Sequence, residues 1–352
     1  MPKDILKEAD AELHRIGKRI SFLAVNPNNE TKERKKFFAS KTYEPQFTYE
    51  NYRTNIDKAI EQLQAIRFNR SRMGYILKHK RDEHINRFLM LKNRGTSDFT
   101  SYSSKVFSKP NKLLVKKARR LLRIEEEKPN PKLDPKEVTE TLKTALAFYG
   151  FNWEVKQKVM TAKAAVNQAK KQVLVKKGMK FSIDFIKRLI THEIGTHVIR
   201  YENGLLQPYK IFATGLPKYF ETEEGLAVVN EERAGVLQKR ILRIYAARAV
   251  AVSMAKDKGF REIYRYLRQF FKPEDAWKIT VRAKRGISDT SQPGGLTKDY
   301  LYLNGYYKVK NYLKRYSINR LYYGKVSMHY AKVLDRIPDL AEPKYLPRYM
   351  EK

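Results

Sequence analysis

The segment THEIGTH, Thr191 to His197, carries two of the six histidines of this 352-residue chain. His192 and His197 stand five positions apart, and Glu193 directly follows the first of them. Imidazoles are common ligands of a catalytic zinc ion, and a carboxylate beside them can serve as a general base. The segment therefore predicts one zinc ion held by both histidines, with Glu193 as the catalytic acid/base.

The spacing of the two histidines constrains the local fold. Zinc-binding histidines on a helix usually stand four residues apart, whereas a spacing of five in a regular α-helix directs the two rings about 140° apart. A π-type bulge absorbs the extra residue and returns both rings to one face. Gly195 suits such a turn, because glycine tolerates torsions outside the helical range. We expect a widened turn at residues 194–196, in a helix capped by Ser182.

The third zinc ligand is expected to be a carboxylate, since the chain contains no cysteine. The candidates are Glu223 and Glu224, which lie in the stretch FETEEGLAVVNEE after an irregular segment and near the start of a helix. Spacing alone leaves both of them open, and acidic residues also favour helix starts for dipole reasons. Hydrolysis of a peptide bond would further need a donor to the oxyanion, for which Tyr219 is a candidate.

The remaining pattern predicts a helix-dominated α+β fold with a small β-sheet. The proline-containing stretch at residues 125–137 marks a boundary between a helical, basic N-terminal region, residues 1–125, and a metallopeptidase catalytic domain, residues 126–352. Short strands are expected at residues 152–159 and 172–175. The expected helices of the second region span residues 138–148, 183–197, 222–256, 261–271, 273–284, 297–316 and 324–333.

The chain is strongly basic, with 73 Lys and Arg against 38 Asp and Glu and a formal charge of +35. Such a field attracts nucleic acid, anionic membranes or acidic protein tails, although charges spread evenly over solvated faces are an equal alternative. Residues 109–123 predict a basic amphipathic helix with Leu114, Ala118, Leu121 and Leu122 on one stripe.

The N-terminus lacks the apolar stretch of a signal peptide, and no run is long enough to span a membrane. We expect a cytoplasmic protein.

Several motifs resemble one known family. HEIGTH, followed by Asn203-Gly204 and Gln207-Pro208 and then by EEGLA at residues 223–227, resembles a metallopeptidase family with a Q-E-G-L-A motif. Its eukaryotic members include the microtubule-associated tyrosine carboxypeptidases, which remove the terminal tyrosine of α-tubulin. YEPQFTY at residues 43–49 and RAKRGISDTSQPGGLTKDYLYLNGY at residues 282–306 are also similar to segments of that family.

This resemblance implies a zincin-like core in which His192, His197 and Glu224, the glutamate directly before Gly-Leu-Ala, bind zinc. It also implies that Glu193 is the acid/base and that the C-terminal residue of a protein or peptide is removed, with tyrosine or another aromatic residue as the candidate. The chain departs from the family at Glu223, where many relatives have Gln. The loop before EEGLA is shorter than in the tubulin-cutting members, so tubulin itself is not carried over.

A carboxypeptidase must recognise a free α-carboxylate, for which Arg or Lys is suited. Arg282, Lys284 and Arg285 are the candidates from the basic segment, and an acidic substrate tail would suit the charge of the chain.

Two alternative functions remain. One is a zinc endo- or aminopeptidase with the same site. The other is a basic nucleic-acid-binding protein with a non-catalytic metal site, against which the intact His-Glu-His set argues.

Overall fold

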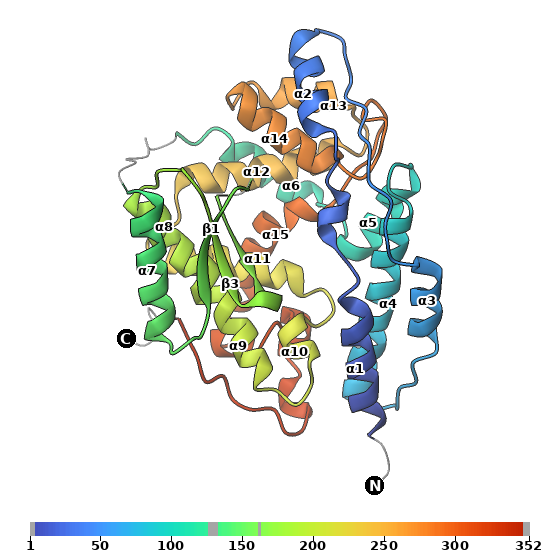
Figure 1. The fold of residues 1–352 in the computed structure, drawn as a ribbon, viewed down its shortest axis with the longest axis vertical. Coiled ribbons are helices and arrows are strands. Elements are labelled where there is room, and N and C mark those ends of the chain that lie inside the picture. The colour runs from blue at the N-terminus through green and yellow to red at the C-terminus, as the bar shows by residue number, and fades with distance from the viewer. Residues whose placement is uncertain (1–3, 126–132, 161–162, 348–352) are drawn as a thin grey trace. The chain divides into compact units, whose positions relative to one another are not determined.

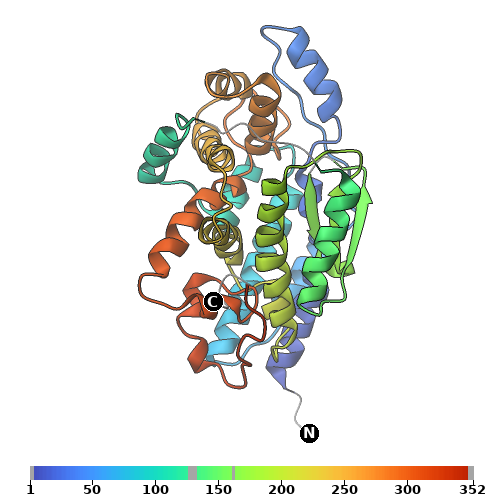
Figure 2. The ribbon, with the colours of Figure 1, turned by 90° about the vertical axis from the view of Figure 1, so that its left-hand side faces the viewer.

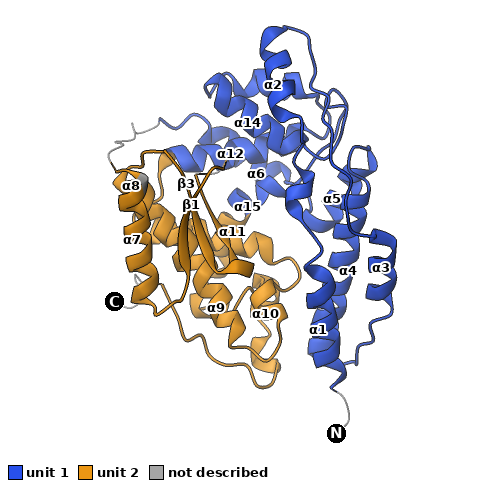
Figure 3. Ribbon diagram, viewed as in Figure 1, with its two compact units in different colours: residues 1–125, 240–304 blue, residues 126–239, 305–352 orange. Residues whose placement is uncertain are grey.

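The structure is a computed structural model that describes residues 4–125, 133–160 and 163–347. It forms two compact units (Figure 3). Unit 1 contains Met1–Glu125 and Arg240–Asn304, and unit 2 contains Glu126–Lys239 and Gly305–Lys352. The predicted boundary near residue 125 coincides with a boundary between the units. The segment Arg240–Asn304, however, which the sequence placed in the catalytic domain, packs within unit 1.

Unit 1 consists of helices and connecting loops in the residues that the structure describes (Figure 1). Of the described helices, none is both long enough and apolar enough to cross a lipid bilayer. The α-helices of unit 1 are α1 (Ile5–Gly17), α2 (Glu30–Ala39), α3 (Ile56–Gln64), α4 (Arg72–Lys92), α5 (Asp98–Phe107), α6 (Lys112–Leu121), α12 (Lys239–Met254), α13 (Phe260–Leu267), α14 (Pro273–Lys284) and the start of α15 (Leu301–Tyr312).

An aromatic cluster explains why segments far apart in the sequence share unit 1. Phe37 of α2 packs edge-to-face on Phe260 of α13, with ring centroids 5.2 Å apart, and also contacts Trp277 of α14 at 5.1 Å. Aromatic pairs in this geometry add to the free energy gained by burying their surface. Beside the cluster, the amide of Phe47 donates to the carbonyl of Ser288 at 2.8 Å. The two family-like segments of unit 1 therefore lie side by side.

Unit 2 combines a small sheet with helices. Its α-helices are α7 (Pro135–Phe148), α8 (Ile183–Leu189), α9 (Ile199–Leu205), α10 (Ile211–Thr214), α11 (Tyr219–Arg233), α16 (Met328–Ala331) and the larger part of α15. Its strands are β1 (Glu154–Lys158), β2 (Ala164–Asn167) and β3 (Gln172–Lys176). A π-helical segment, η3 (Ile190–Val198), joins α8 to α9.

The sheet has the order β1-β3-β2, with β1 parallel and β2 antiparallel to β3. In register, Val155 faces Val173 and Ala165 faces Leu174. Helix α7 packs along β1 and β3, as the two views in Figures 1 and 2 show. The helix-dominated α+β class with a small sheet is confirmed. Strand β2 was not predicted. Its four residues are all half-buried, so buried and exposed side chains do not alternate along it, and the sequence shows no period of two.

Two helix predictions need correction. The single helix predicted over residues 222–256 is broken into α11 and α12, because the chain turns at Gly235 in a left-handed conformation with φ 68°. The final helix, predicted over residues 324–333, is reduced to the single turn of α16. The helix predicted over residues 297–316 is confirmed in its central part, where a 3₁₀ turn at Lys298–Tyr300 precedes α15.

Candidate metal centre

The histidine segment is π-helical from Ile190 to Val198, so the predicted widened turn is confirmed. The amide of Ile199 donates to the carbonyl of Ile194, five residues earlier, as a π-helix requires. The rings of His192 and His197 consequently lie on one side of the helix, with their centroids 5.0 Å apart and their planes at 75°. A regular α-helix would have separated them.

A buried hydrogen-bond network supports the π-turn. The hydroxyl of Tyr322 donates to the carbonyl of Gly195 at 3.0 Å, and the hydroxyl of Thr196 donates to the carbonyl of Thr191 at 3.3 Å. The amide of Asn230, on α11, donates to both hydroxyls at 2.7 Å. Buried backbone carbonyls need such partners, because leaving one unpaired costs free energy. The network therefore offsets the cost of the irregular turn.

Gly195 plays a smaller part than its sequence position suggested. It is absent from the residues with positive φ, so no unusual torsion is used there. A Cβ atom added at Gly195 would meet the carbonyl oxygen of Ile190 at 3.7 Å and Cβ of Pro347 at 3.9 Å, which are ordinary contacts. The left-handed conformation that glycine alone adopts easily is therefore not what permits the widened turn.

Three side chains converge where the π-turn faces α11. The ligand atoms of His192, His197 and Glu224 all lie within 4.8 Å of one another, and Nε2 of His192 lies 4.0 Å from Oε2 of Glu224. Within the described residues, this is the group of His and acidic side chains whose geometry suits a metal ion. The structure therefore brings together both histidines and the glutamate that precedes Gly-Leu-Ala.

A backbone-to-backbone contact places α11. A Cβ atom added at Gly225 would lie 2.2 Å from the carbonyl carbon of Gly305 on α15, and one added at Gly305 would lie 2.1 Å from the carbonyl oxygen of Glu221. No side chain larger than hydrogen fits between these helices. The glycine in EEGLA is therefore required by close helix packing, and the packing positions the glutamate beside it.

Two further carboxylates orient the histidine rings. Nδ1 of His192 lies 2.6 Å from Oε1 of Glu231, which also accepts a hydrogen bond from Arg188 at 2.8 Å. Nδ1 of His197 lies 2.8 Å from Oε1 of Glu223. Each carboxylate favours a proton on Nδ1 and leaves the Nε2 lone pair free for a metal, an arrangement common around zinc. The donor set therefore fits a zinc ion.

Buried cations hold Glu223 in its ionised form. The guanidinium of Arg200, which has 0% exposure, donates to Glu223 and to the carbonyls of Leu321 at 2.9 Å and Gly324 at 3.0 Å. Nζ of Lys325 lies 3.5 Å from the same carboxylate. Burial raises the pKa of Glu223, but these two cations and His197 more than offset it and hold the pKa well below its usual range.

His197 responds to the same charges. Burial lowers its pKa, whereas the hydrogen bond and charge of Glu223, followed by the charges of Glu193 and Glu224, raise it, and the net shift is upward. The surroundings of His197 therefore favour positive charge, which a cation bound to the neutral ring would supply. This electrostatic preference is a second respect in which the residues suit a divalent metal ion.

Glu193 and Tyr219 differ in their surroundings. Glu193 is half-buried and makes no hydrogen bond or ion pair with another described residue, so its carboxylate is not committed to a structural contact. Tyr219 is 8% exposed, stacks on Phe220 with a centroid distance of 4.3 Å, and lies under the ammonium of Lys325 at 5.7 Å. It packs as an interior aromatic residue, and its part as oxyanion donor stays a prediction.

The predicted substrate cations lie in unit 1, in α14 and directly after it. Arg282 forms two hydrogen bonds with Asp299 and retains 33% side-chain exposure, while Arg285 lies 3.6 Å from the same carboxylate. Lys284 has 0% exposure and donates to the carbonyl of Lys258 at 3.2 Å. The contacts of Lys284 are those of a structural residue. Contact of these three side chains with substrate stays a prediction.

The residues that support the ligands were not identified from the sequence. Glu231 follows Glu224 by seven positions, which is two helical turns, so both lie on one face of α11 and helical periodicity points to it. Arg200, Lys325 and Tyr322 carry no comparable signal. They are distant in the sequence from the carboxylate or the carbonyl that they contact, and only folding brings them together.

Comparison with known proteins identifies one family whose sequence model matches most of this chain. A sequence model of the family described as microtubule-associated tyrosine carboxypeptidase matches residues 35–352. A human protein named "Putative tyrosine carboxypeptidase MATCAP2" is 35% identical over 179 residues, which cover 47% of this chain and 33% of the relative. Mouse microtubule-associated tyrosine carboxypeptidase 1 is 34% identical over 133 residues, covering 36% and 27%. The chain thus matches about a third or less of these relatives.

Proposed function

Because the chain belongs to the microtubule-associated tyrosine carboxypeptidase family, we propose that it is a zinc-dependent carboxypeptidase with a zincin-like core. The observation that carries this proposal is the convergence of His192, His197 and Glu224 within 4.8 Å. Glu193 lies beside the first of them with an uncommitted carboxylate. The substrate class is the C-terminus of a protein or peptide.

The residues of the chain supply the metal ligands and the acid/base that peptide hydrolysis requires. His192, His197 and Glu224 would hold zinc, which when bound lowers the pKa of a water molecule toward neutrality and polarises a carbonyl. Glu193 takes the proton of the attacking water and delivers it to the amine that leaves. Glu231 and Glu223 hold the two imidazoles in the tautomer that binds metal.

The names of the relatives support an aromatic leaving residue, with tyrosine as the first candidate. They also support the cytoplasmic location that the sequence predicted, since one relative is named as microtubule-associated. For this chain both remain part of the proposal. An acidic tail on the substrate would be favoured by the net charge of +35.

The proposal is tested with the zinc-loaded protein and a library of peptides that differ in their C-terminal residue. Mass spectrometry should detect loss of one C-terminal residue, fastest for aromatic residues. Glu193→Gln should abolish the loss while its zinc content, measured by atomic absorption, stays at one per chain. Zinc-loaded wild type that releases no residue from any peptide would overturn the proposal.

Blocked peptides distinguish the alternative peptidases. C-terminal amidation should abolish cleavage, because no free carboxylate remains, whereas N-terminal acetylation should leave the rate unchanged. Cleavage of amidated peptides at internal bonds would indicate an endopeptidase, and sensitivity to acetylation would indicate an aminopeptidase. A nucleic-acid-binding protein with a non-catalytic metal site would hydrolyse none of these peptides.

A further inference from the structure

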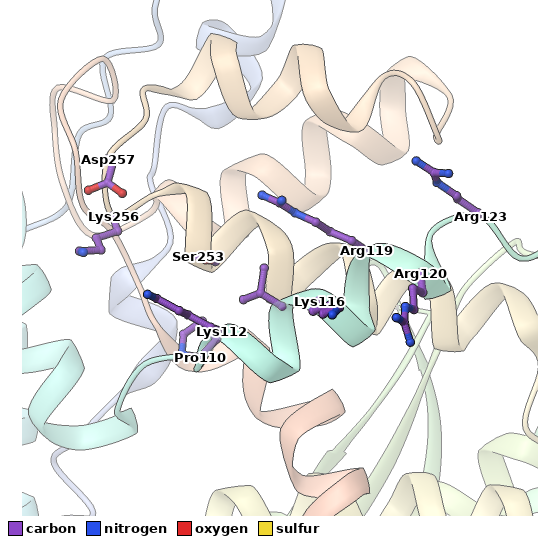
Figure 4. Close-up of a pocket in the computed structure, with 10 residues that line it drawn as sticks. Pro110, Lys112, Lys116, Arg119, Arg120, Arg123, Ser253, Lys256 and Asp257 are labelled. Atoms are coloured by element: carbon purple, nitrogen blue, oxygen red, sulfur yellow. The ribbon is translucent and has the colours of Figure 1, made fainter.

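Helix α6 lies beside the end of α12 and the turn after it, and together they line a basic groove within unit 1 that the proposed peptidase activity does not use (Figure 4). The groove has a volume of about 630 Å³. Six cations line it: Lys112, Lys116, Arg119, Arg120, Arg123 and Lys256. Asp257 is the single acidic residue among its lining residues. All six cationic side chains are exposed, and none has a hydrogen-bond or ion-pair partner among the described residues.

The groove follows from the amphipathic pattern of α6. Leu114, Ala118 and Leu122 are buried, as the sequence predicted. On another face of the helix, Lys112, Lys116 and Arg119 fall within a stripe about 60° wide, and Arg123 follows just beyond the end of α6. One cation therefore follows another at intervals of about 4.5–6 Å along a single line. Unpaired like charges at this spacing repel one another and favour an extended anion as counter-charge.

The rest of the lining restricts what that anion can be. The other side chains that line the groove are Pro110, Val115 and Ser253, so no described residue of its lining is aromatic. Most of its lining residues lie on α6 and α12, whose backbone groups are largely paired within the helices. Peptide recognition usually needs a free strand edge or an apolar groove for anchoring side chains. Phosphate recognition needs only cations, and arginine offers a planar fork that pairs with two phosphate oxygens.

We propose that this groove binds the phosphodiester backbone of a single-stranded nucleic acid without sequence preference. The line of cations meets successive phosphates. Without an aromatic wall the groove cannot stack bases, which is the usual source of base preference in single-strand binding. This inference goes beyond the proposed peptidase function and does not rest on it, because all its residues lie in unit 1.

Fluorescence anisotropy with a labelled twelve-nucleotide oligo(dT) tests the proposal on the full chain. We expect binding that weakens steeply with salt, with a log–log slope of about −4 if all six cations contact phosphates. Lys116→Ala/Arg119→Ala/Arg123→Ala should weaken binding about 100-fold at 0.1 M salt and reduce the slope by about 2. Oligo(dT) and a mixed-sequence oligonucleotide should bind equally well.

A matched triple variant separates the groove from the general field of the protein. Lys136→Ala/Lys170→Ala/Lys177→Ala removes the same charge from exposed positions of unit 2 and should leave the affinity nearly unchanged. Equal loss in both variants would overturn the groove assignment. So would tighter binding of a decaglutamate peptide or of a DNA duplex than of oligo(dT), since either would assign the groove to another occupant.

A measurement on the wild-type protein does not depend on variants folding. A 4-thiouridine oligonucleotide, photo-crosslinked to the zinc-loaded chain and digested, should mark peptides that contain residues 110–123 and 253–257. Crosslinks confined to other segments would overturn the proposal. Peptidase activity on tripeptides without charged side chains should be the same for the groove variant and the wild type.

Discussion

The carboxylate of Glu231 lies 2.6 Å from Nδ1 of His192. Glu231 is fully buried and is held in turn by Arg188 at 2.8 Å, so the orientation of the imidazole is set by a rigid pair rather than by solvent. With zinc bound as proposed, the metal affinity of the site should depend on Glu231, a residue that does not touch the metal.

Replacing Glu231 by Gln should therefore weaken zinc binding about 10- to 100-fold, because the neutral amide no longer favours the Nδ1–H tautomer. Competition with a chromophoric chelator measures this affinity. Glu232→Gln is the matched control, since Glu232 is partly exposed and pairs with Lys310 at the surface. Equal zinc affinities for the two variants would contradict the orienting role.

Glu223 and Glu224 should differ in what they stabilise. Glu223→Gln removes the counter-charge of Arg200 and Lys325, both buried, and should lower the free energy of unfolding by about 3–5 kcal/mol, the usual cost of an uncompensated buried charge. Glu224→Gln should abolish zinc binding and change the stability of the metal-free protein by less than about 1 kcal/mol. Urea denaturation of the metal-free proteins measures both.

A second substitution tests whether uncompensated charge causes the predicted loss of stability in Glu223→Gln. Lys325→Met in the Glu223→Gln background removes one of the two uncompensated cations and should recover part of the lost stability. If the double variant is as unstable as Glu223→Gln alone, or less stable still, charge balance is not the reason for the effect.

The two helical glycines of the site should tolerate alanine very differently. Gly225→Ala drives a methyl group into the backbone of Gly305 and should destabilise the protein by about 3 kcal/mol or more. Gly195→Ala meets only ordinary contacts and should change stability by less than about 1 kcal/mol. Denaturation midpoints rank the two, and zinc should still bind to Gly195→Ala. Loss of zinc binding in that variant would show that the π-turn does need glycine.

The hydroxyl of Tyr322 should be needed for the π-turn. Tyr322→Phe leaves the carbonyl of Gly195 without that donor and the amide of Asn230 without one acceptor, and should cost about 1–3 kcal/mol of stability. Zinc affinity should fall as well, because the register of His197 depends on the turn. Tyr323→Phe, at a partly exposed neighbouring position, should leave zinc affinity unchanged. A Tyr322→Phe protein with wild-type zinc affinity would contradict this link.

Stability should depend on Lys284 at alkaline pH. Burial lowers the pKa of Lys284 from 10.5 to about 8. Below pH 8 both folded and unfolded chains carry the proton, and the cost of burying the charge is constant. Between pH 8 and 10.5 the unfolded chain binds more protons, so the free energy of unfolding should rise by up to about 1.4 kcal/mol per pH unit.

Comparison with Lys284→Met isolates this contribution from the other groups that titrate at alkaline pH. Urea midpoints measured from pH 7.5 to 10.5 should rise more with pH in the wild type than in the variant. Parallel pH dependences in the two proteins would show that the ammonium is not held in a desolvated position.

The sequence by itself determined the features that depend on local spacing. The five-residue interval between His192 and His197 required a π-turn if both rings were to share a face, and the structure contains that turn. The buried face of α6 and the strands β1 and β3 likewise follow from periodicity over a few residues. In each case the residues that carry the pattern lie within one or two helical turns or along a single strand, although buried contacts from Tyr322 and Asn230 help to hold the π-turn.

The family resemblance pointed to Glu224 as the ligand, but only the tertiary structure gives the physical reason why Glu223 and Glu224 differ. Adjacent residues on an α-helix point about 100° apart, and the spacing of the sequence does not say which direction faces the histidines. The contact of Gly225 with Gly305 fixes how α11 is turned, and so places Glu224 among the ligand atoms and Glu223 against Arg200. The grouping of Arg240–Asn304 with unit 1 was decided in the same way, by aromatic contacts between segments more than two hundred residues apart. Such contacts depend on the shapes of the two packed surfaces, which cannot be derived from the spacing of residues in the sequence.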